Sequence, residues 1–173
     1  IGVAQMLARG NMGGPMVTLK DAREASNVGC LELAVPGKDS GYLYIGQDNL
    51  ALYLELALNN GARRSDGVQM GVPTGDPRKF ESFEDVRAAF YEQVLHMRRQ
   101  TQKNGDRTEK KLIDEYPMPY ESVMIEGCVE KGLCREDGGA HYNFNTGGTE
   151  VGSSDAADSL AAIKRLVFDE KKI

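Results

Sequence analysis

The sequence has few of the residues that build disulfide frameworks, metal sites or membrane spans. It contains three cysteines and two histidines among 173 residues, and no Cys-x-x-Cys pair. An odd number of cysteines predicts no disulfide framework, and His96 and His141 lie too far apart to give a metal-ligand spacing. No apolar run is long enough to span a membrane, and no signal peptide is visible. These absences predict a protein of the reducing cytoplasm.

The sequence also lacks an excess of basic residues. Lysine and arginine together number 21 against 26 aspartates and glutamates, giving a net charge of −5, which argues against a nucleic-acid-binding surface. A hydrophobic content of 40% and a charged content of 27% are typical of a globular domain of this length. The chain begins at Ile1 rather than methionine, so we expect it to be a piece of a longer protein.

The segment from Ser26 to Lys38 is the most informative stretch. It places a thiol, Cys30, two residues before a carboxylate, Glu32, and then turns at Pro36-Gly37. A capping box of Thr18 with Asp21 predicts a helix over 21–25 just before it. The helix-stop residues that follow place Cys30 on a loop just past the helix end.

Two interpretations of this segment remain open from spacing alone. In an extended segment, residues i and i+2 point the same way, so Cys30 and Glu32 can face one cavity. That arrangement suits one-electron chemistry at sulfur with an adjacent base. A buried small cysteine beside a surface glutamate is the commoner meaning of such a pattern. A thiol hydrolase using Cys30 and His141 has little support, because no third orienting group is apparent.

The same Gly-Cys-x-Glu string recurs at 127–130 with the opposite interpretation. We expect a helix over 120–131 there, and residues i and i+2 of a helix point about 200° apart. This thiol and carboxylate therefore cannot face one cavity. Cys128 is predicted to be a core residue, and Cys134 a buried or loop thiol.

The remaining pattern is mostly helical with short strands. A second capping box, Ser82 with Asp85, opens a predicted helix over 83–103. We expect a polar break over 104–109 and a long loop over 61–80 in which an Arg-Arg pair most simply forms a solvated turn. Further expected elements are a strand or loop over 41–47, a helix over 49–59 capped by Asp48, a Gly/Ser/Thr loop over 145–154 and a helix over 155–171.

Three segments together resemble the glycyl radical enzymes, the family of pyruvate formate-lyase. They are Gly29-Cys30-Leu31-Glu32 with Pro36-Gly37-Lys38, then Leu54 to Gly61, and Gly138 to Phe144 followed by Ala157 to Lys164. The segment Thr74 to Pro77 with the helix after it is similar to the family too. The resemblance covers nearly the whole chain in the right order, and it favours the catalytic interpretation of Cys30.

The resemblance implies a fold, a mechanism and a set of roles. The fold class is α/β, with residues 1–173 forming a single, mostly helical segment of the family's ten-stranded β/α barrel and a Cys loop at about 26–40. In the family, a glycine on a C-terminal loop stores a radical and oxidises a cysteine, which then abstracts hydrogen from substrate. Cys30 matches that cysteine, and Glu32 matches its general acid/base.

The sequence departs from the family pattern in two places. The glycyl-radical motif, an Arg-Val-x-Gly-Tyr-like segment, is absent, so the segment alone is expected to be inactive. Tyr42 and Tyr44 stand where diol dehydratases have a Trp-His-Asp-like run, so glycerol or propanediol is disfavoured as substrate. These tyrosines are candidate substrate-binding residues for a cyclic or aromatic substrate, in a hydroxyproline dehydration or an arylacetate decarboxylation.

The resemblance also implies the partners and leaves alternatives open. A radical SAM activating enzyme installs the glycyl radical, on a domain not present here, and this segment is expected to bind no cofactor or metal. The full-length enzyme is expected to be a cytoplasmic homodimer of anaerobic metabolism that acts on a small molecule, without nucleic acid or membrane. The alternatives are a truncated, non-catalytic assembly piece, or a radical C–C bond-forming enzyme like the succinate synthases, which the presence of Glu32 disfavours.

Overall fold

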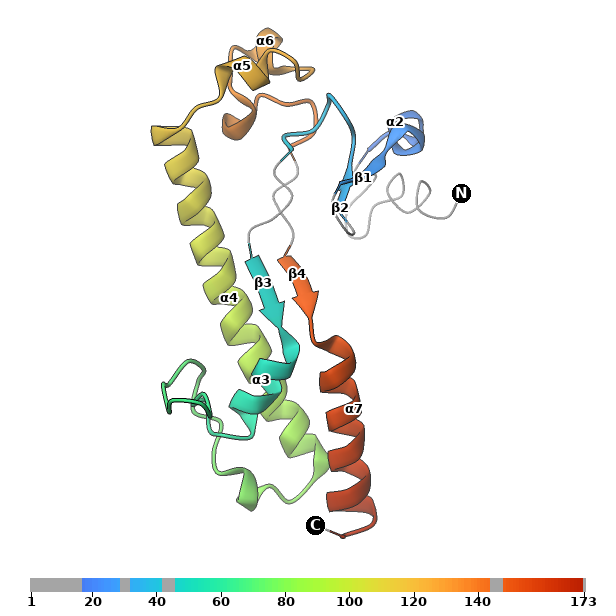
Figure 1. The fold of residues 1–173 in the computed structure, drawn as a ribbon, viewed down its shortest axis with the longest axis vertical. Helices are drawn as coiled ribbons and strands as arrows, with labels where there is room; N and C mark the ends of the chain where they lie inside the picture. The colour runs from blue at the N-terminus through green and yellow to red at the C-terminus, as the bar shows by residue number, and fades with distance from the viewer. Residues whose placement is uncertain (1–16, 29–31, 42–45, 144–147, 173) are drawn as a thin grey trace. The chain divides into compact units, whose positions relative to one another are not determined.

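The computed structural model describes residues 17–28, 32–41, 46–143 and 148–172. The chain divides into two compact units, and each is described by itself. The first unit contains residues 1–44 and 107–147, and the second contains residues 45–106 and 148–173. The helix α4 (Phe83–Glu115) contributes residues to both units (Figure 1). Among the described residues, no helix is long and apolar enough to cross a membrane.

The first unit is built from one hairpin and several short helices. Its elements are α2 (Leu19–Glu24), β1 (Ser26–Val28), β2 (Glu32–Ala34), α5 (Pro119–Ser122), α6 (Cys128–Lys131) and the 3-10 helix η2 (Arg135–Asp137). The strands β1 and β2 pair antiparallel, with Val28 opposite Glu32 and Ser26 opposite Ala34. A small core of the same unit consists of Val17, Ala22 and Val35, with Tyr142 packed against it.

The second unit contains the parallel strand pair and the larger core. Its elements are β3 (Gly46–Asn49), α3 (Leu50–Ala57), the 3-10 helix η1 (Pro77–Lys79), most of α4, β4 (Gly148–Val151), α7 (Ser153–Ile163) and the π-helical turn η3 (Lys164–Asp169). The strands β3 and β4 lie side by side and run in the same direction, with Gly46 opposite Gly148 (Figure 1). Parallel strands need a long connection, which here is about one hundred residues.

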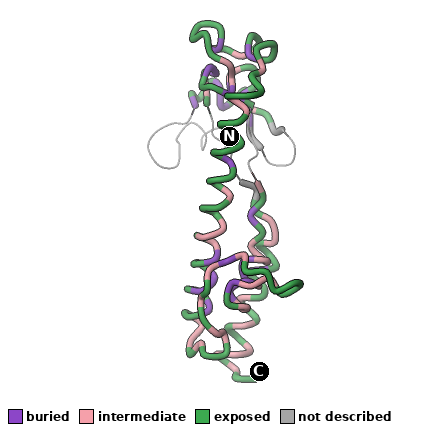
Figure 2. The backbone as a smooth tube through the Cα atoms, turned by 90° about the vertical axis from the view of Figure 1, so that its left-hand side faces the viewer, coloured by how far each residue is buried: buried purple, intermediate pink, exposed green. Residues whose placement is uncertain are grey.

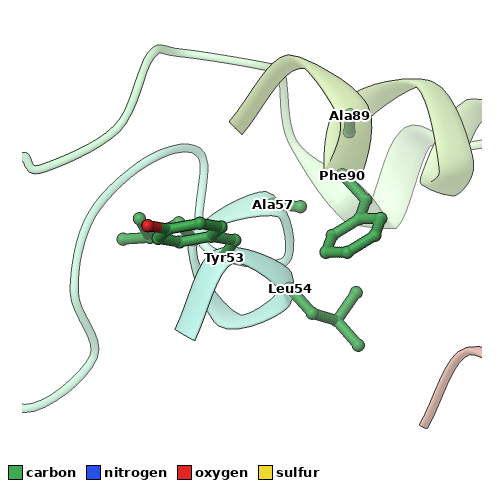
Figure 3. Packing of buried hydrophobic residues seen from close by; sticks show 6 residues of the cluster. Tyr53, Leu54, Ala57, Ala89 and Phe90 are labelled. Atoms are coloured by element: carbon green, nitrogen blue, oxygen red, sulfur yellow. The ribbon is translucent and has the colours of Figure 1, made fainter. Parts of the chain in front are cut away.

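The core of the second unit forms between α3 and the first turns of α4. Leu54 and Ala57 on α3 point toward the side of Phe90 on α4, whereas the Tyr53 ring lies on the other side of α3 (Figure 3). The buried positions of α4 recur every three or four residues from Val86 to Gln93, as an amphipathic helix requires. Beyond them α4 is mostly exposed or half-buried, as the tube in Figure 2 shows.

Several expected elements differ from those observed. The polar stretch 104–109 does not break the helix, because α4 runs unbroken from Phe83 to Glu115. The expected helix 120–131 is instead α5 and α6, separated by residues 123–127, and Gly127 just before α6 has a φ of +97°, which is incompatible with a continuous helix. The predicted Gly/Ser/Thr loop contains strand β4, since a distant partner strand supplies its hydrogen bonds.

Smaller corrections concern where elements begin and end. The cap of α3 is Asn49, whose side chain accepts from the Leu52 N–H at 3.0 Å, and Asp48 belongs to β3. Strand β3 includes Gly46 and Gln47 of the expected strand or loop over 41–47, and residues 42–45 of that stretch lie outside the described residues. The last helix begins at Ser153 and changes to a π-helical turn at Lys164. The capping boxes and the long loop over 61–80 are confirmed, with η1 inside the loop.

Candidate active-site hairpin

The β1–β2 hairpin is the element on which the sequence prediction centres. Thr18 caps α2 by accepting the Asp21 N–H at 3.1 Å, and Ala25 then turns into extended backbone. Strand β1 therefore follows the helix, and the predicted loop position of Cys30 falls in residues 29–31, which lie outside the described residues. The register pairs Val28 with Glu32, so residues 29–31 connect two strand ends held opposite each other.

The predicted site residues lie mostly outside the described part of the chain. Cys30, Tyr42 and Tyr44 fall in segments that the structure does not describe, and for Glu32 only the backbone in β2 is described. The structure describes only the segments that adjoin these residues in the sequence. It describes the strands on both sides of 29–31 and the segments on both sides of 42–45.

The turn after β2 is closed by the side chain of Asp39, which is buried. One carboxylate oxygen accepts from the Val35 N–H, and the other accepts from the Gly41 N–H at 3.0 Å. The guanidinium of Arg135 donates to the Ser40 carbonyl at 3.2 Å. These bonds fix the backbone that leads from the hairpin toward Tyr42.

A charged network joins this turn to α2. The Lys38 ammonium donates to Asp21 at 2.5 Å, and the Tyr142 hydroxyl donates to the same carboxylate at 2.6 Å. Lys38 foremost, then Tyr142 and Thr18, hold the pKa of Asp21 far below its usual range. Asp21 in turn raises the pKa of Lys38. The local sequence marks Asp21 only as part of a helix cap, because its partners Lys38 and Tyr142 lie 17 and 121 residues away along the chain.

A third buried carboxylate, Asp48, anchors the strand that follows Tyr44 in the sequence. Asp48 of β3 accepts from the Tyr53 hydroxyl at 2.7 Å and from Arg98 of α4 at 2.8 Å. Arg98 also lies 3.3 Å from Glu150 of β4. Burial, and next the bond to Asp48, raise the pKa of Tyr53, which keeps its hydroxyl protonated as a donor. The pair β3 and β4 is therefore tied to both neighbouring helices.

The other two cysteines do not have the features of a reactive thiol. Cys128 is buried, as predicted, and that burial raises the pKa of its thiol, so it stays protonated and unreactive. Glu130 of the same Gly-Cys-x-Glu string caps α6, accepting the Gly127 N–H at 3.1 Å. Cys134 is half-buried at the start of η2. Among the described residues, no cluster of three His, Cys, Asp or Glu side chains could hold a metal ion.

Comparison with known proteins found similar sequences over most of the chain. The family model described as pyruvate formate lyase-like matches residues 1–173. Trans-4-hydroxy-L-proline dehydratase of Clostridioides difficile is 39% identical over 157 residues, which are 90% of this chain and 19% of that protein. (2S)-3-sulfopropanediol dehydratase of Klebsiella oxytoca is 35% identical over 156 residues, with the same two coverages.

A solved structure shows the same fold. The crystal structure of hydroxyproline dehydratase from Clostridioides difficile, with trans-4-hydroxy-L-proline bound, superimposes with a TM-score of 0.88 at 36% identity. The superposition covers 99% of this chain and 21% of that one. The chain thus spans about a fifth of the length of these relatives, and its fold is that of a segment of their barrel. It belongs to the pyruvate formate lyase-like family, the glycyl radical enzymes.

Proposed function

We propose that residues 1–173 form the cysteine-loop segment of a glycyl radical lyase, with Cys30 as the thiyl carrier and Glu32 as the acid/base. The observation that carries the proposal is the β1–β2 register inside a family match over the whole chain. Pairing of Val28 with Glu32 holds the backbone on both sides of Cys30. A thiol on so short a connection between paired strands fits a group that must meet both a stored radical and a substrate.

The chemistry assigns one task to each residue. A glycyl radical, supplied by sequence outside residues 1–173, takes the hydrogen atom from the Cys30 thiol. The Cys30 sulfur then breaks a substrate C–H bond by forming an S–H bond. As the substrate C–O bond breaks, the departing hydroxyl takes up a proton and leaves as water, and Glu32 moves the protons that this elimination requires. Cys30 finally returns its hydrogen atom to the product radical.

We propose dehydration of a cyclic hydroxylated amino acid such as trans-4-hydroxy-L-proline as the reaction. The support is the 39% identity and the TM-score of 0.88 to enzymes named for that substrate. Tyr42 and Tyr44 are the proposed substrate-binding residues, since they replace the run expected of a diol-binding site. Decarboxylation of an arylacetate is the other reaction type that two tyrosines would suit.

The proposal includes partners that the family chemistry requires. A radical SAM activating enzyme would install the glycyl radical anaerobically, and the full-length enzyme would act as a homodimer in the cytoplasm. A second candidate reaction is dehydration of a sulfonated diol, supported by 35% identity to (2S)-3-sulfopropanediol dehydratase.

The test uses the protein as encoded, together with any sequence that adjoins residues 1–173, activated anaerobically by its activating enzyme. Electron paramagnetic resonance measures the radical, and product formation is followed with trans-4-hydroxy-L-proline and (2S)-3-sulfopropanediol. Cys30→Ser should keep the radical and lose turnover, whereas Cys134→Ser should keep both. Full turnover in Cys30→Ser would refute the role of Cys30. An activated wild-type protein with no turnover of any family substrate would favour a non-catalytic assembly role.

A further inference from the structure

An ion pair of low exposure joins the two ends of the β1–β2 hairpin. Asp21 lies on α2, just before β1, and Lys38 lies in the turn just after β2. Their side-chain atoms are 2.5 Å apart, and the carboxylate side chain of Asp21 is only 7% exposed. The pair therefore closes the base of the hairpin, at the end opposite residues 29–31.

A third segment clamps the same base from elsewhere in the first unit. The Tyr142 hydroxyl donates to Asp21 at 2.6 Å, and the Tyr142 N–H donates to the Lys38 carbonyl at 2.8 Å. The Ser40 N–H donates to the Tyr142 carbonyl at 3.0 Å, and Thr18 N–H lies 3.3 Å from the Tyr142 hydroxyl. Asp21 is thus the one carboxylate among these residues that contacts both Lys38 and Tyr142.

The hairpin depends on such a clamp because its own ladder is short. Only three residue pairs join β1 and β2, and an isolated two-stranded hairpin is marginally stable in water. A hydrogen-bonded polar cluster of low exposure fixes the geometry of the hairpin base, because its members form all of their hydrogen bonds in only one arrangement. Helix α2, the turn at 36–40 and Tyr142 therefore define the direction in which the hairpin leaves the small core.

We propose that Asp21, acting through Lys38 and Tyr142, is a positioning residue that sets the β1–β2 hairpin for hydrogen abstraction. This inference rests on the proposed function, because the hairpin carries the cysteine assigned as thiyl carrier. The rate of hydrogen transfer falls steeply as the distance between the two reacting atoms grows. A small tilt of the hairpin should therefore lower the rate of the chemical step. Asp21 touches neither sulfur nor substrate in this role.

The charges around the pair make it persist at neutral pH. Glu126 lies 3.9 Å from the Lys38 ammonium, and Glu24 of α2 also acts on it favourably. The His141 ring lies 3.5 Å from Glu126. The bonds from Lys38 and Tyr142 hold the pKa of Asp21 far below neutral, so its carboxylate stays ionised.

The test compares Asp21→Asn and Tyr142→Phe with wild type in the activated protein as encoded. A misplacement of about 1 Å can reduce a chemical step by about 100-fold, so kcat should fall about 10- to 100-fold. KM should stay within about twofold, because substrate-binding groups are untouched. The radical signal should stay at the wild-type level. Asp66→Asn is the matched control, since Asp66 pairs with Arg63 on an exposed turn of the second unit.

A second readout does not depend on turnover. Hydrogen exchange, followed by mass spectrometry, should rise over residues 26–41 in Asp21→Asn and stay unchanged elsewhere. Lys38→Arg, which keeps the positive charge opposite Asp21, should show both effects only in part. Should Asp21→Asn fold poorly, Tyr142→Phe is the deciding variant, because it removes only the hydroxyl that donates to the Asp21 carboxylate.

The outcomes separate the two proposals. Unchanged exchange and unchanged kcat in both variants would overturn the positioning role, while an inactive Cys30→Ser would leave the proposed function standing. Loss of radical signal in proportion to turnover would assign Asp21 to general folding and would also overturn it. If Asp21→Asn raises hydrogen exchange only over residues 26–41 while the activated wild-type protein has no turnover, the positioning of the hairpin is supported and the proposed function is refuted.

Discussion

At the scale of single residues, Gln93 shows how a polar side chain in the core fixes a loop. It lies on α4 and is fully buried. Its side-chain oxygen accepts the Val72 N–H at 3.0 Å, and its amide nitrogen donates to the Val72 carbonyl at 2.7 Å. The nitrogen also lies 3.2 Å from the Thr74 hydroxyl. One side chain therefore satisfies both backbone groups of Val72 in the long loop over 61–80.

Gln93→Leu should destabilise the protein although it keeps nearly the same volume. The substitution leaves the Val72 N–H and C=O without partners, which costs about 1–3 kcal/mol of unfolding free energy. Urea denaturation measures this change. Gln102→Leu is the control, because Gln102 is exposed on the same helix and its side chain donates to Asp106 at 2.7 Å. Equal effects of the two substitutions would contradict the role of Gln93.

Cysteine shows what residue patterns can and cannot decide before a structure is known. The contrast between the two Gly-Cys-x-Glu strings rests on local periodicity, and the burial of Cys128 is confirmed. The partners of Asp21 were beyond such reasoning, because a side chain in α2 meets Tyr142 only through the tertiary fold. The assignments of Cys30, Glu32, Tyr42 and Tyr44 remain predictions that the experiments above address.

At the scale of elements, local signals predicted where helices begin better than where they end. The box of Ser82 with Asp85 correctly placed the start of α4, because its bonds form within one turn. The polar composition of 104–109 suggested an interruption, yet solvent-facing polar residues extend a helix without difficulty. Strand β4 was missed because nothing local marks it, and its pairing with β3 is non-local.

Removal of the cap at Ser82 should weaken the start of α4. Its hydroxyl accepts from the Asp85 N–H and donates to the Asp85 carboxylate at 2.9 Å. Ser82→Ala should lower the unfolding free energy by about 0.5–2 kcal/mol, and Ser82→Thr should retain most of the stability. Thermal denaturation followed by circular dichroism checks both. A stable Ser82→Ala would show that packing of Phe90 and its neighbours suffices to start the helix.

At the scale of the whole molecule, bonded carboxylates set the response to acid. The pKa is lowered, in each case foremost by a side-chain hydrogen bond, at Asp21, Asp66, Asp76, Asp85 and Glu170. A folded pKa below the unfolded one adds stability that is complete above the unfolded value, near pH 4, and is lost as pH falls.

The melting temperature should therefore fall as pH drops below about 4. Lys38 and Lys110, whose pKa values are raised by Asp21 and Asp114, give the reverse at high pH, with stability lost as pH rises above their ordinary value of 10.5. Calorimetry between these limits should show a plateau. A melting temperature that rises on acidification would contradict this account.

Several large apolar side chains are exposed in the part of the first unit that follows α4 and precedes η2 in the sequence. They are Tyr116, Tyr120, Val123, Met124, Val129 and Leu133. Residues 1–173 expressed alone should self-associate through these side chains, because such clusters are unfavourable in water. Tyr120→Lys with Val123→Lys should reduce that association in sedimentation velocity, whereas Leu95→Lys on α4 should have little effect. A monomeric wild-type segment would refute the prediction.

The parallel pairing of β3 with β4 has a consequence for synthesis on the ribosome. Gly46 meets Gly148, so the ladder closes a loop of about one hundred residues. At about 5–20 residues per second, β3 waits roughly 5–20 seconds for its partner to be made. During that time the backbone donors and acceptors along β3 are open to other chains. This interval is the point in the life of the protein at which a chaperone would matter most.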